Sequence, residues 1–340
     1  MKKILITGGA GYIGSHTAVE LVNSGFEPII IDDLSNSNED VIDRLEEITG
    51  KRLAFYLGDC SDRALLDKIA KEHELSGVIH FAAFKAVGES TKLPLKYYHN
   101  NVGSLLVLLD FMKDKGIKDL VFSSSCTVYG QADQLPVTEE TPRKDAESPY
   151  GNTKKICEDI LKDFVASKPG IRVISLRYFN PIGAHPSAKI GELPSGIPSN
   201  LVPFVTQVAA GIREKVTIFG DDYDTVDGTC VRDYIHVVDL ADAHVKALAF
   251  LEKQPVDSYE VFNVGTGNGN TVLEVIQTFE KVNGLKLNYQ IGPRRPGDVV
   301  KIWADTQKIN TVLGWFPQFT LENSLRDSWS WEKSLRKSEV

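Results

Sequence analysis

Cysteine is scarce in this sequence, and its pattern argues against two kinds of site. Four cysteines stand far apart in 340 residues, at Cys60, Cys126, Cys157 and Cys230. They form no C-x-x-C pair, and the seven histidines form no H-x-H or H-x-x-x-H pair. Disulfide frameworks are typical of much smaller secreted chains, and metal sites need closely spaced ligands. We therefore expect reduced thiols, a cytoplasmic location and no metal.

Long hydrophobic runs and basic blocks are also missing. The amino-terminal sequence MKKILITGGAGYIG has the apolar run ILI, which is too short for a signal peptide or a membrane span. The net charge is −8 and the pI is about 5.5. These values argue against nucleic acid or an acidic membrane surface as the main partner. An anionic small ligand would need local arginines to offset the net negative charge of the protein.

What the chain does have is an alternation of short apolar runs with segments of helical periodicity. Hydrophobic residues make up 42% of the sequence, which is enough for a buried core. Strands are predicted by KILITGG, EPIIIDD, LAFYLGD, GVIHFAA, DLVFSSS and IRVISLRYFN, and helices between them by segments such as SHTAVELVNSG and RALLDKIAKEHEL. This alternation predicts an α/β fold with a doubly wound parallel sheet of the Rossmann type.

The pattern changes after residue 180. Residues 180–200, NPIGAHPSAKIGELPSGIPSN, are rich in Pro, Gly and Ser and predict a long loop or a boundary. The later predicted elements are mixed: helix LVPFVTQVAAGI, strand KVTIFG, helix VVDLADAHVKALAFLEK, strand EVFNVG and a helix from Thr271. We therefore expect a Rossmann domain over residues 1–180 and a smaller mixed α/β domain over 181–340, with some later segments returning to the first.

A glycine-rich turn follows the first predicted strand. Gly8, Gly11 and Gly14 have G-x-x-G-x-x-G spacing at the start of a predicted helix, which lets backbone amides approach a pyrophosphate. The second predicted strand ends in Asp32 and Asp33, eighteen positions after Gly14. An acidic residue there binds the ribose hydroxyls and repels a 2′-phosphate. The first domain is therefore predicted to bind NAD rather than NADP.

Other loop residues near this turn allow two readings. Asp59 and Lys85 follow the third and fourth predicted strands, where they either reach the cofactor or are ordinary loop residues. A second glycine-rich stretch, NVGTGNGNTVLEVI, lacks a paired second strand that ends in an acid. We interpret this stretch as a turn in which Thr271 caps the following helix.

The stretch SPYGNTKKICED places Tyr150 four residues before Lys154, next to a proline that can open a helix. At that spacing two side chains share one helix face, about 5–6 Å apart. A phenol is a poor base at neutral pH, and a fixed ammonium beside it lowers its pKa. Ser125 ends the fifth predicted strand, where open α/β sheets bind ligands. A dinucleotide with Ser125, Tyr150 and Lys154 is typical of hydride transfer at an alcohol carbon.

With these motifs in place, the sequence resembles the extended short-chain dehydrogenase/reductase family, and within it the branch of UDP-glucose (UDP-galactose) 4-epimerases. The matching stretches are TGGAGYIGSH, IDDLSNS, HFAAFKAVGES, YYHNNVGS, FSSSCTVYG, SPYGNTKK, LRYFNPIGAHPS, IPSNLVPF, VRDYIHVVDLADAH, FNVGTGNG and RRPGDV. The resemblance implies oxidation of a UDP-hexose at C4, rotation of the keto sugar, and reduction on its opposite face. It also implies that NAD is tightly bound and regenerated in each cycle.

The resemblance implies a role for each matching residue. Tyr150 would take the proton of the sugar 4-OH, Lys154 would bind the nicotinamide ribose, and Ser125 would hydrogen-bond to the reacting oxygen. The implied cofactor-binding residues are these three with Gly8, Gly11, Tyr12, Ile13, Gly14, Asp32, Asp33, Asn36, Ser37, Asp59, Cys60, Phe81, Ala82, Lys85, Asn100 and Phe179. The implied substrate-binding residues are Lys85, Ser125, Thr127, Tyr150, Phe179, Asn180, Asn200, Leu201, Phe219, Arg232, Arg295, Asp298 and Ile302.

Several alternatives remain open on the sequence alone. Arg232 in isolation could pair with Asp233 or Asp239 instead of a diphosphate. Ile302 stands where many epimerases restricted to glucose and galactose carry a tyrosine, so UDP-GlcNAc and UDP-GalNAc are possible second substrates. Another UDP-sugar, such as a pentose or a uronate, and a non-catalytic NAD-binding sensor are rival functions. The resemblance also implies a homodimer.

A nucleotide-sugar 4,6-dehydratase is a further relative with the same fold. Such an enzyme needs an adjacent Asp–Glu pair after the fifth strand to remove water. Those positions here are Cys126 and Thr127, which cannot do that acid–base work. Dehydration is therefore not expected.

Overall fold

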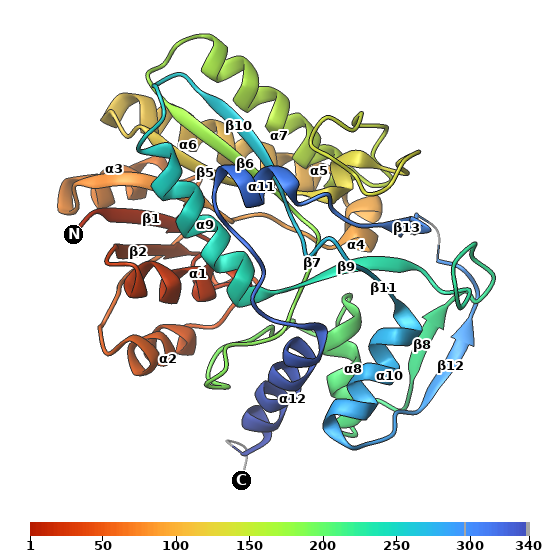
Figure 1. The fold of residues 1–340 in the computed structure, drawn as a ribbon. Coiled ribbons are helices and arrows are strands. Elements are labelled where there is room, and N and C mark those ends of the chain that lie inside the picture. The colour runs from red at the N-terminus through yellow and green to blue at the C-terminus, as the bar shows by residue number, and fades with distance from the viewer. Residues whose placement is uncertain (296, 338–340) are drawn as a thin grey trace. The chain divides into compact units, whose positions relative to one another are not determined.

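A computed structural model describes residues 1–295 and 297–337 of the chain. Contacts within the chain group these residues into two compact units (Figure 1). Unit 1 comprises residues 1–130, 143–178 and 241–262, and unit 2 comprises residues 131–142, 179–240 and 263–340. The expected domain division at residue 180 stays a prediction. None of the helices in the described part of the chain is long and apolar enough to cross a membrane.

Unit 1 is built on a seven-stranded sheet. Its order is β10-β6-β5-β4-β1-β2-β3, and the pairings from β1 to β6 are parallel. This is the doubly wound order of the Rossmann fold with one strand added. The strands are β1 Lys3–Thr7, β2 Glu27–Asp32, β3 Ala54–Leu57, β4 Leu75–His80, β5 Asp119–Ser125, β6 Arg172–Tyr178 and β10 Tyr259–Val264. The predicted fold class and the six predicted strands are confirmed.

Helices connect these strands and supply much of the apolar core of unit 1. Their inward faces pack leucines, isoleucines and aromatic residues onto a sheet whose central strands are buried, because each crossover returns across a face of the parallel sheet. The helices are α1 Tyr12–Asn23, α2 Asp40–Thr49, α3 Arg63–Glu72, α4 Val87–Lys92, α5 Pro94–Tyr97, α6 Gly103–Lys115, α7 Pro149–Ala166 and α9 Val237–Leu251, with a π-helical turn over Tyr98–Val102 and a 3₁₀ turn over Cys126–Tyr129.

Unit 2 combines two small sheets with helices. One sheet has the order β11-β9-β13, with β7 also paired to β9, and the other pairs β12 with β8. The helices α8, α10 and α12 contribute to its apolar core. The elements are β7 Asn180–Ile182, α8 Leu201–Ala209, β8 Val216–Phe219, β9 Val231–His236, β11 Gly269–Thr271, α10 Val272–Asn283, β12 Tyr289–Gly292, β13 Lys301–Ile302, α11 Gln307–Val312 and α12 Leu321–Lys337.

Several elements of unit 2 differ from the expected pattern. The predicted loop over residues 180–200 begins with a short strand, β7, because Asn180–Ile182 pair in parallel with Tyr234–His236 of β9. The elements β11, β12, β13, α11 and α12 have no counterpart among the predicted elements, and neither has strand β9. Its sequence VRDYIH mixes charged and apolar residues, and its strand character comes from pairing with β7, β11 and β13.

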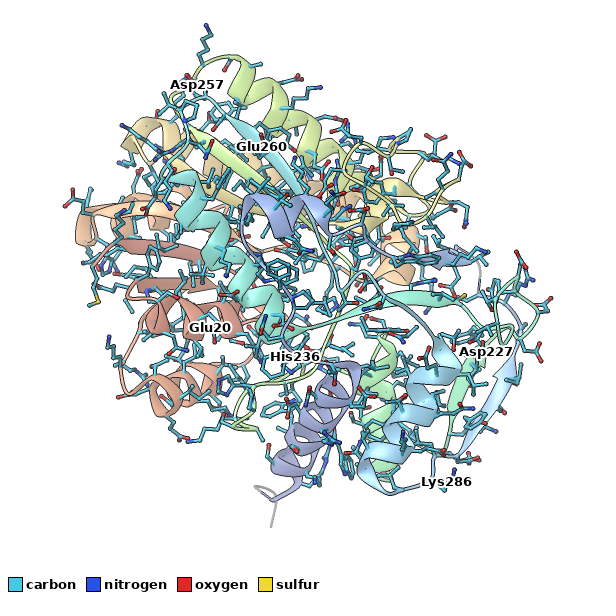
Figure 2. All side chains as sticks on the ribbon, in the orientation of Figure 1. Glu20, Asp227, His236, Asp257, Glu260 and Lys286 are labelled. Carbon is cyan, nitrogen blue, oxygen red and sulfur yellow. The ribbon has the colours of Figure 1, made fainter. Side chains whose placement is uncertain are left out.

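The second glycine-rich stretch forms the predicted turn and helix cap. The hydroxyl of Thr271 accepts a hydrogen bond from the Glu274 amide at 3.0 Å, and the Glu274 carboxylate accepts one from the Thr271 amide at 3.3 Å. This reciprocal capping box satisfies backbone donors at the start of α10. The hydroxyl of Thr271 also donates to the carboxylate of Asp227, which is labelled in Figure 2.

Replacing Thr271 with alanine should therefore weaken unit 2. Loss of an N-cap side chain costs about 1 kcal/mol, so we expect Thr271→Ala to lower the midpoint of urea unfolding. Gln277→Ala is the matched control, because that side chain lies on the same helix and is exposed. Equal midpoints for the two variants would show that the cap contributes no stability.

Candidate functional site

The predicted cofactor turn lies between β1 and α1 in unit 1. Gly8 has a positive φ of 69°, and a Cβ added to it would stand 2.9 Å from the amide nitrogen of Ala82. A Cβ on Gly14 would stand 2.3 Å from the carbonyl oxygen of Gly8. The N-cap of α1 is Gly11, which provides no side-chain cap for the first amides of the helix. A glycine cradle that opens onto uncapped amides fits the pyrophosphate of a dinucleotide.

The two acidic residues after β2 have different surroundings. Asp32 is buried, and its carboxylate accepts hydrogen bonds from the amides of Ala10 (3.0 Å) and Leu34 (2.9 Å) and from the Ser37 hydroxyl (2.7 Å). Asp33 is exposed and accepts from the Ser35 amide at 2.9 Å. Asp32 therefore ties the glycine turn to the end of β2. A carboxylate can accept about four hydrogen bonds, so both Asp32 and Asp33 can still accept one from a ribose hydroxyl. Ribose binding by either residue stays a prediction.

The remaining predicted cofactor residues of unit 1 lie on loops or helix starts. Asp59 is exposed and accepts from the Ser61 amide at 2.7 Å, and burial raises the pKa of the Cys60 thiol to about 12. The Lys85 ammonium lies 5.9 Å from the centre of the Tyr12 ring. The structure thus brings together Lys85, from the loop after β4, and Tyr12, the first residue of α1.

Asn101 is a residue that the sequence analysis does not identify. Its buried amide bonds to both the amide nitrogen (2.9 Å) and the carbonyl oxygen (3.0 Å) of Phe84, and donates to the Thr153 hydroxyl of α7 at 3.0 Å. The predicted Asn100 donates to Asn101 at 3.0 Å. Asn101 thereby fixes the loop after β4 to the helix that carries Tyr150. The paired asparagines in YYHNNV are the signal that points to it.

The predicted catalytic residues meet at the carboxyl end of β5. Helix α7 begins as predicted: Ser148 is its N-cap, with its hydroxyl accepting from the Gly151 amide at 3.2 Å, and Pro149 stands in the first turn. The hydroxyl oxygen of Ser125 accepts from the Thr127 hydroxyl at 3.0 Å and from the Thr127 amide at 3.2 Å. Ser125 also hydrogen-bonds with Tyr150. Thr127, Ser125 and Tyr150 therefore form one hydrogen-bonded chain.

Burial is the main influence on the pKa values of Tyr150 and Lys154. Burial raises the pKa of Tyr150 to about 12, although its hydrogen bond with Ser125 acts in the opposite direction. The Lys154 ammonium donates to the carbonyl oxygen of Ser123 at 2.6 Å, and burial lowers its pKa to about 8. Burial is the largest influence on the pKa of Tyr150 here, and the lowering expected from Lys154 together with NAD⁺ stays a prediction.

In unit 2, several predicted substrate residues form a cluster. Arg295 makes a bidentate ion pair with Asp298, at 2.7 and 3.1 Å, and Arg232 lies 3.7 Å from the same carboxylate. The Arg295 guanidinium lies 5.5 Å from the centre of the Phe219 ring. Ile302 is buried and is the Cα partner of Arg232 between β13 and β9. Two guanidinium groups beside an aromatic ring suit a nucleoside diphosphate.

The alternative partners of Arg232 have other contacts. Asp233 accepts from the amides of Gly267 (3.0 Å) and Ala304 (3.1 Å), and Asp239 accepts from those of Gln318 (2.9 Å) and Phe319 (3.0 Å). A structural pairing of Arg232 with Asp233 or Asp239 is therefore not what this fold uses.

Four other predicted substrate residues of unit 2 lie at the start of a helix or strand, or make a backbone hydrogen bond. Asn200 is the N-cap residue of α8, where its amide donates to Glu192 at 2.7 Å, and Leu201 is the first residue of that helix. Phe179 is buried, and its amide donates to the Val264 carbonyl at 3.2 Å. Asn180 begins β7. Their contacts with a substrate stay predictions.

A Rossmann sheet with a serine, a tyrosine and a lysine at the carboxyl end of β5 and on α7 defines an extended short-chain dehydrogenase/reductase. A family model described as GDP-mannose 4,6 dehydratase matches residues 5–328. The UDP-glucose 4-epimerase of Bacillus subtilis is 52% identical over 97% of each chain. Given this identity, the chain belongs to the UDP-glucose 4-epimerase family.

Solved structures agree with this assignment. A UDP-glucose 4-epimerase from Stenotrophomonas maltophilia, with bound NAD and formylated UDP-arabinopyranose, has a TM-score of 0.96 and 46% identity over 99% of this chain and 100% of that one. The enzyme from Bifidobacterium longum, in complex with NAD⁺ and UDP, has a TM-score of 0.94 and 46% identity over 98% of each chain.

The glycine cradle gives a direct test of the cofactor site. In Gly14→Ala the new methyl group would collide with the carbonyl oxygen of Gly8 and the Cα of Gly9, so we expect purified protein without bound NAD. The nucleotide released on denaturation measures this. Gly103→Ala is the matched control, because a Cβ there meets no atom within 4 Å. Equal NAD content in both variants would contradict the assigned cradle.

Proposed function

We propose that this protein interconverts UDP-galactose and UDP-glucose with a tightly bound NAD. The observation that supports this proposal is the row of hydrogen-bonded side chains Thr127, Ser125 and Tyr150, with Lys154 one helical turn beyond. The protein that carries them is 52% identical to a UDP-glucose 4-epimerase. The reaction involves no net oxidation, so the cofactor is regenerated within each cycle.

Residues of unit 1 hold the cofactor in this proposal. The amides at the start of α1 bind the pyrophosphate, Asp32 or Asp33 binds the adenosine ribose, and Lys154 binds the nicotinamide ribose. When bound, NAD would supply the acceptance and return of the C4 hydride, which is chemistry that the side chains lack.

Tyr150 moves the proton in both half-reactions. As a phenolate it accepts the proton of the 4-OH, and as a phenol it returns that proton to the 4-keto oxygen. Ser125, held by two hydrogen bonds from Thr127, donates to the reacting oxygen and fixes its position. The positive charges of Lys154 and NAD⁺ lower the phenol pKa from its value of about 12 toward the working pH.

The nucleotide part of the substrate is assigned to unit 2. Arg232 and Arg295 bind the diphosphate, Asp298 binds the uridine ribose, and Phe219 lines the uracil pocket. Arginine suits this role because its planar fork matches phosphate oxygens, and two of them work against the overall charge of −8. Firm binding of UDP with loose binding of the hexose lets the keto sugar present its other face.

The rival functions have less support. A sensor that binds NAD without turnover has no need for the serine, tyrosine and lysine that meet here. A dehydratase, as the family model is described, needs carboxylates where Cys126 and Thr127 stand. A UDP-pentose or UDP-uronate epimerase would share all of these residues. Turnover of those sugars in parallel with UDP-galactose decides between them.

Location and assembly belong to the same proposal. We infer a reducing cytoplasm, which the four free and buried cysteines support. We also infer a homodimer that packs helices such as α7, and sedimentation of the purified protein tests it. A monomer at micromolar concentration would contradict the dimer without affecting the proposed reaction.

Tyr150→Phe tests the reaction directly. With UDP-galactose and no added NAD, we expect the wild type to form UDP-glucose in a coupled assay. The variant should lose a factor of about 10²–10⁴ in kcat, the usual contribution of a general acid–base. Tyr98→Phe is the control, because its hydroxyl bonds to Asn152 on the same helix. No activity in the wild type, or full activity in Tyr150→Phe, would contradict the proposal.

Ile302 tests the choice of sugar. Isoleucine leaves more space than tyrosine, so we expect UDP-GlcNAc to be a slower second substrate of the wild type. Ile302→Tyr should abolish that turnover and keep turnover of UDP-galactose. The ratio of the two rates is the measurement. A wild type inactive on UDP-GlcNAc would remove the second activity from the proposal.

A further inference from the structure

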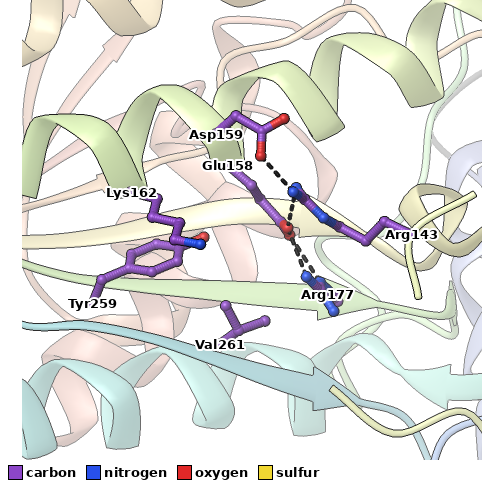
Figure 3. A pocket seen from close by; sticks show the side chains of 7 residues that line it. All are labelled: Arg143, Glu158, Asp159, Lys162, Arg177, Tyr259 and Val261. Atoms are coloured by element: carbon purple, nitrogen blue, oxygen red, sulfur yellow. Dashed lines mark hydrogen bonds and ion pairs between the residues drawn. The ribbon is translucent and has the colours of Figure 1, made fainter. Parts of the chain in front are cut away.

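Glu158 is a buried carboxylate on α7 that the proposed reaction does not use. Both of its oxygens are engaged: Arg177 binds it in a bidentate pair at 2.9 and 2.7 Å, and the Ser124 hydroxyl donates to it at 2.6 Å. Arg143 adds a longer contact at 3.3 Å. Figure 3 shows the carboxylate between the two arginines, beside a pocket of about 260 Å³. Burying this carboxylate without such partners would be strongly unfavourable.

The position of Glu158 continues the catalytic face of α7. Tyr150, Lys154 and Glu158 are spaced at i, i+4 and i+8, so they lie along one stripe of the helix. Each meets one of three consecutive serines of β5. Tyr150 bonds with Ser125, Lys154 donates to the carbonyl of Ser123, and Glu158 accepts from the hydroxyl of Ser124.

Through Arg177, the Glu158 carboxylate is also linked to strand β6 and to the 3₁₀ turn after β5. Arg177 of β6 is the Cα partner of Ser124, one position before the pair of Ser125 with Tyr178. Its guanidinium also donates to the Tyr129 hydroxyl at 2.8 Å. Glu158 therefore links α7, β5 and β6 immediately behind Ser125 and Tyr150.

The charges around Lys154 give Glu158 a second effect. Lys154 is faced by His80 from β4, by Cys157 and Glu158 from its own helix, and by the Phe122 ring from β5, 4.9 Å from the ammonium. Burial lowers the pKa of His80 to about 3 and raises that of the Cys157 thiol to about 12, so both are neutral at pH 7. Of these groups, Glu158 carries the negative charge.

We propose that Glu158 is a positioning residue of the active site, which holds α7 against β5 and places a negative charge one helical turn from Lys154. This inference rests on the proposed function for its kinetic test. The sign of the expected effect follows from the charges. Without the carboxylate, Lys154 has lost its negative neighbour and Arg177 is an uncompensated cation. The ammonium then loses its proton at a lower pH, and activity falls as the pH rises through that lower value.

The test is the pH profile of kcat for UDP-galactose in Glu158→Gln, measured on the full chain with its NAD. The alkaline limb should move to lower pH by about one unit, which is about a tenfold loss on that limb. Asp159→Asn is the matched control, because that neighbouring carboxylate pairs with Arg143 and its side chain is half exposed. Its profile should coincide with that of the wild type.

A second variant covers the case in which Glu158→Gln does not fold. The double variant Glu158→Gln, Arg177→Gln leaves no lone buried charge, so it avoids the main cost of breaking a buried pair. Its alkaline limb should also move to lower pH, by less than in the single variant. A limb that coincides with the wild type in either folded variant would overturn the proposal, whatever the absolute rate.

A direct titration separates this inference from the proposed function. The carbon-13 shift of the Lys154 Cε, in protein labelled at lysine and assigned with Lys154→Arg, reports the ammonium pKa without any turnover. We expect a lower pKa in the double variant than in the wild type. An unchanged pKa would overturn the role of Glu158 even in an active enzyme. An inactive wild type with the expected shift would contradict only the proposed epimerisation.

Discussion

Burial of titratable groups at the carboxyl end of the parallel sheet is the constraint on which the rest of the structure depends. The parallel sheet of unit 1 leaves the end of β5 as the place where Ser125, Tyr150 and Lys154 meet. Removal from water favours the neutral form of each group. The pKa of the phenol is raised to about 12 and that of the ammonium is lowered to about 8. Acid–base chemistry at neutral pH needs the opposite displacement of the phenol, so positive charge has to be brought to it.

Hydrogen bonds in unit 1 offset the cost of burying these polar and charged groups. Three consecutive serines of β5 give α7 a carbonyl and two hydroxyl groups, and Asn101 ties the loop after β4 to the same helix. Glu158 and Arg177 bury opposite charges together behind the site. The glycine turn leaves the first amides of α1 without a side-chain cap for the pyrophosphate of a dinucleotide, whose cationic ring would supply positive charge to Tyr150. The cofactor and Lys154 of α7 together would supply the positive charge that stabilises the phenolate of buried Tyr150.

Local patterns in the sequence predict the sheet of unit 1 and the chemical centre. The continuous apolar strands, the glycine turn and the Tyr150–Lys154 spacing are each short-range signals, and each forms as expected. Long-range pairings are not encoded in this way. The Glu158–Arg177 pair needs the register of β5 and β6, and Arg232 lies against Asp298, 66 positions away, instead of its neighbour Asp233. The preference of Lys154 for the Ser123 carbonyl likewise depends on the packing of a helix on a strand.

The most direct test of this account is the pKa of Tyr150 with and without NAD. Ultraviolet difference spectra between the wild type and Tyr150→Phe isolate the phenolate signal of this one residue. Protein stripped of NAD should show an ionisation near the value of about 12 that burial imposes. With NAD⁺ bound, the positive charges should lower it by about 1–3 units. The same pKa in both forms would show that cofactor charge does not activate Tyr150, and would contradict the mechanism proposed for this site.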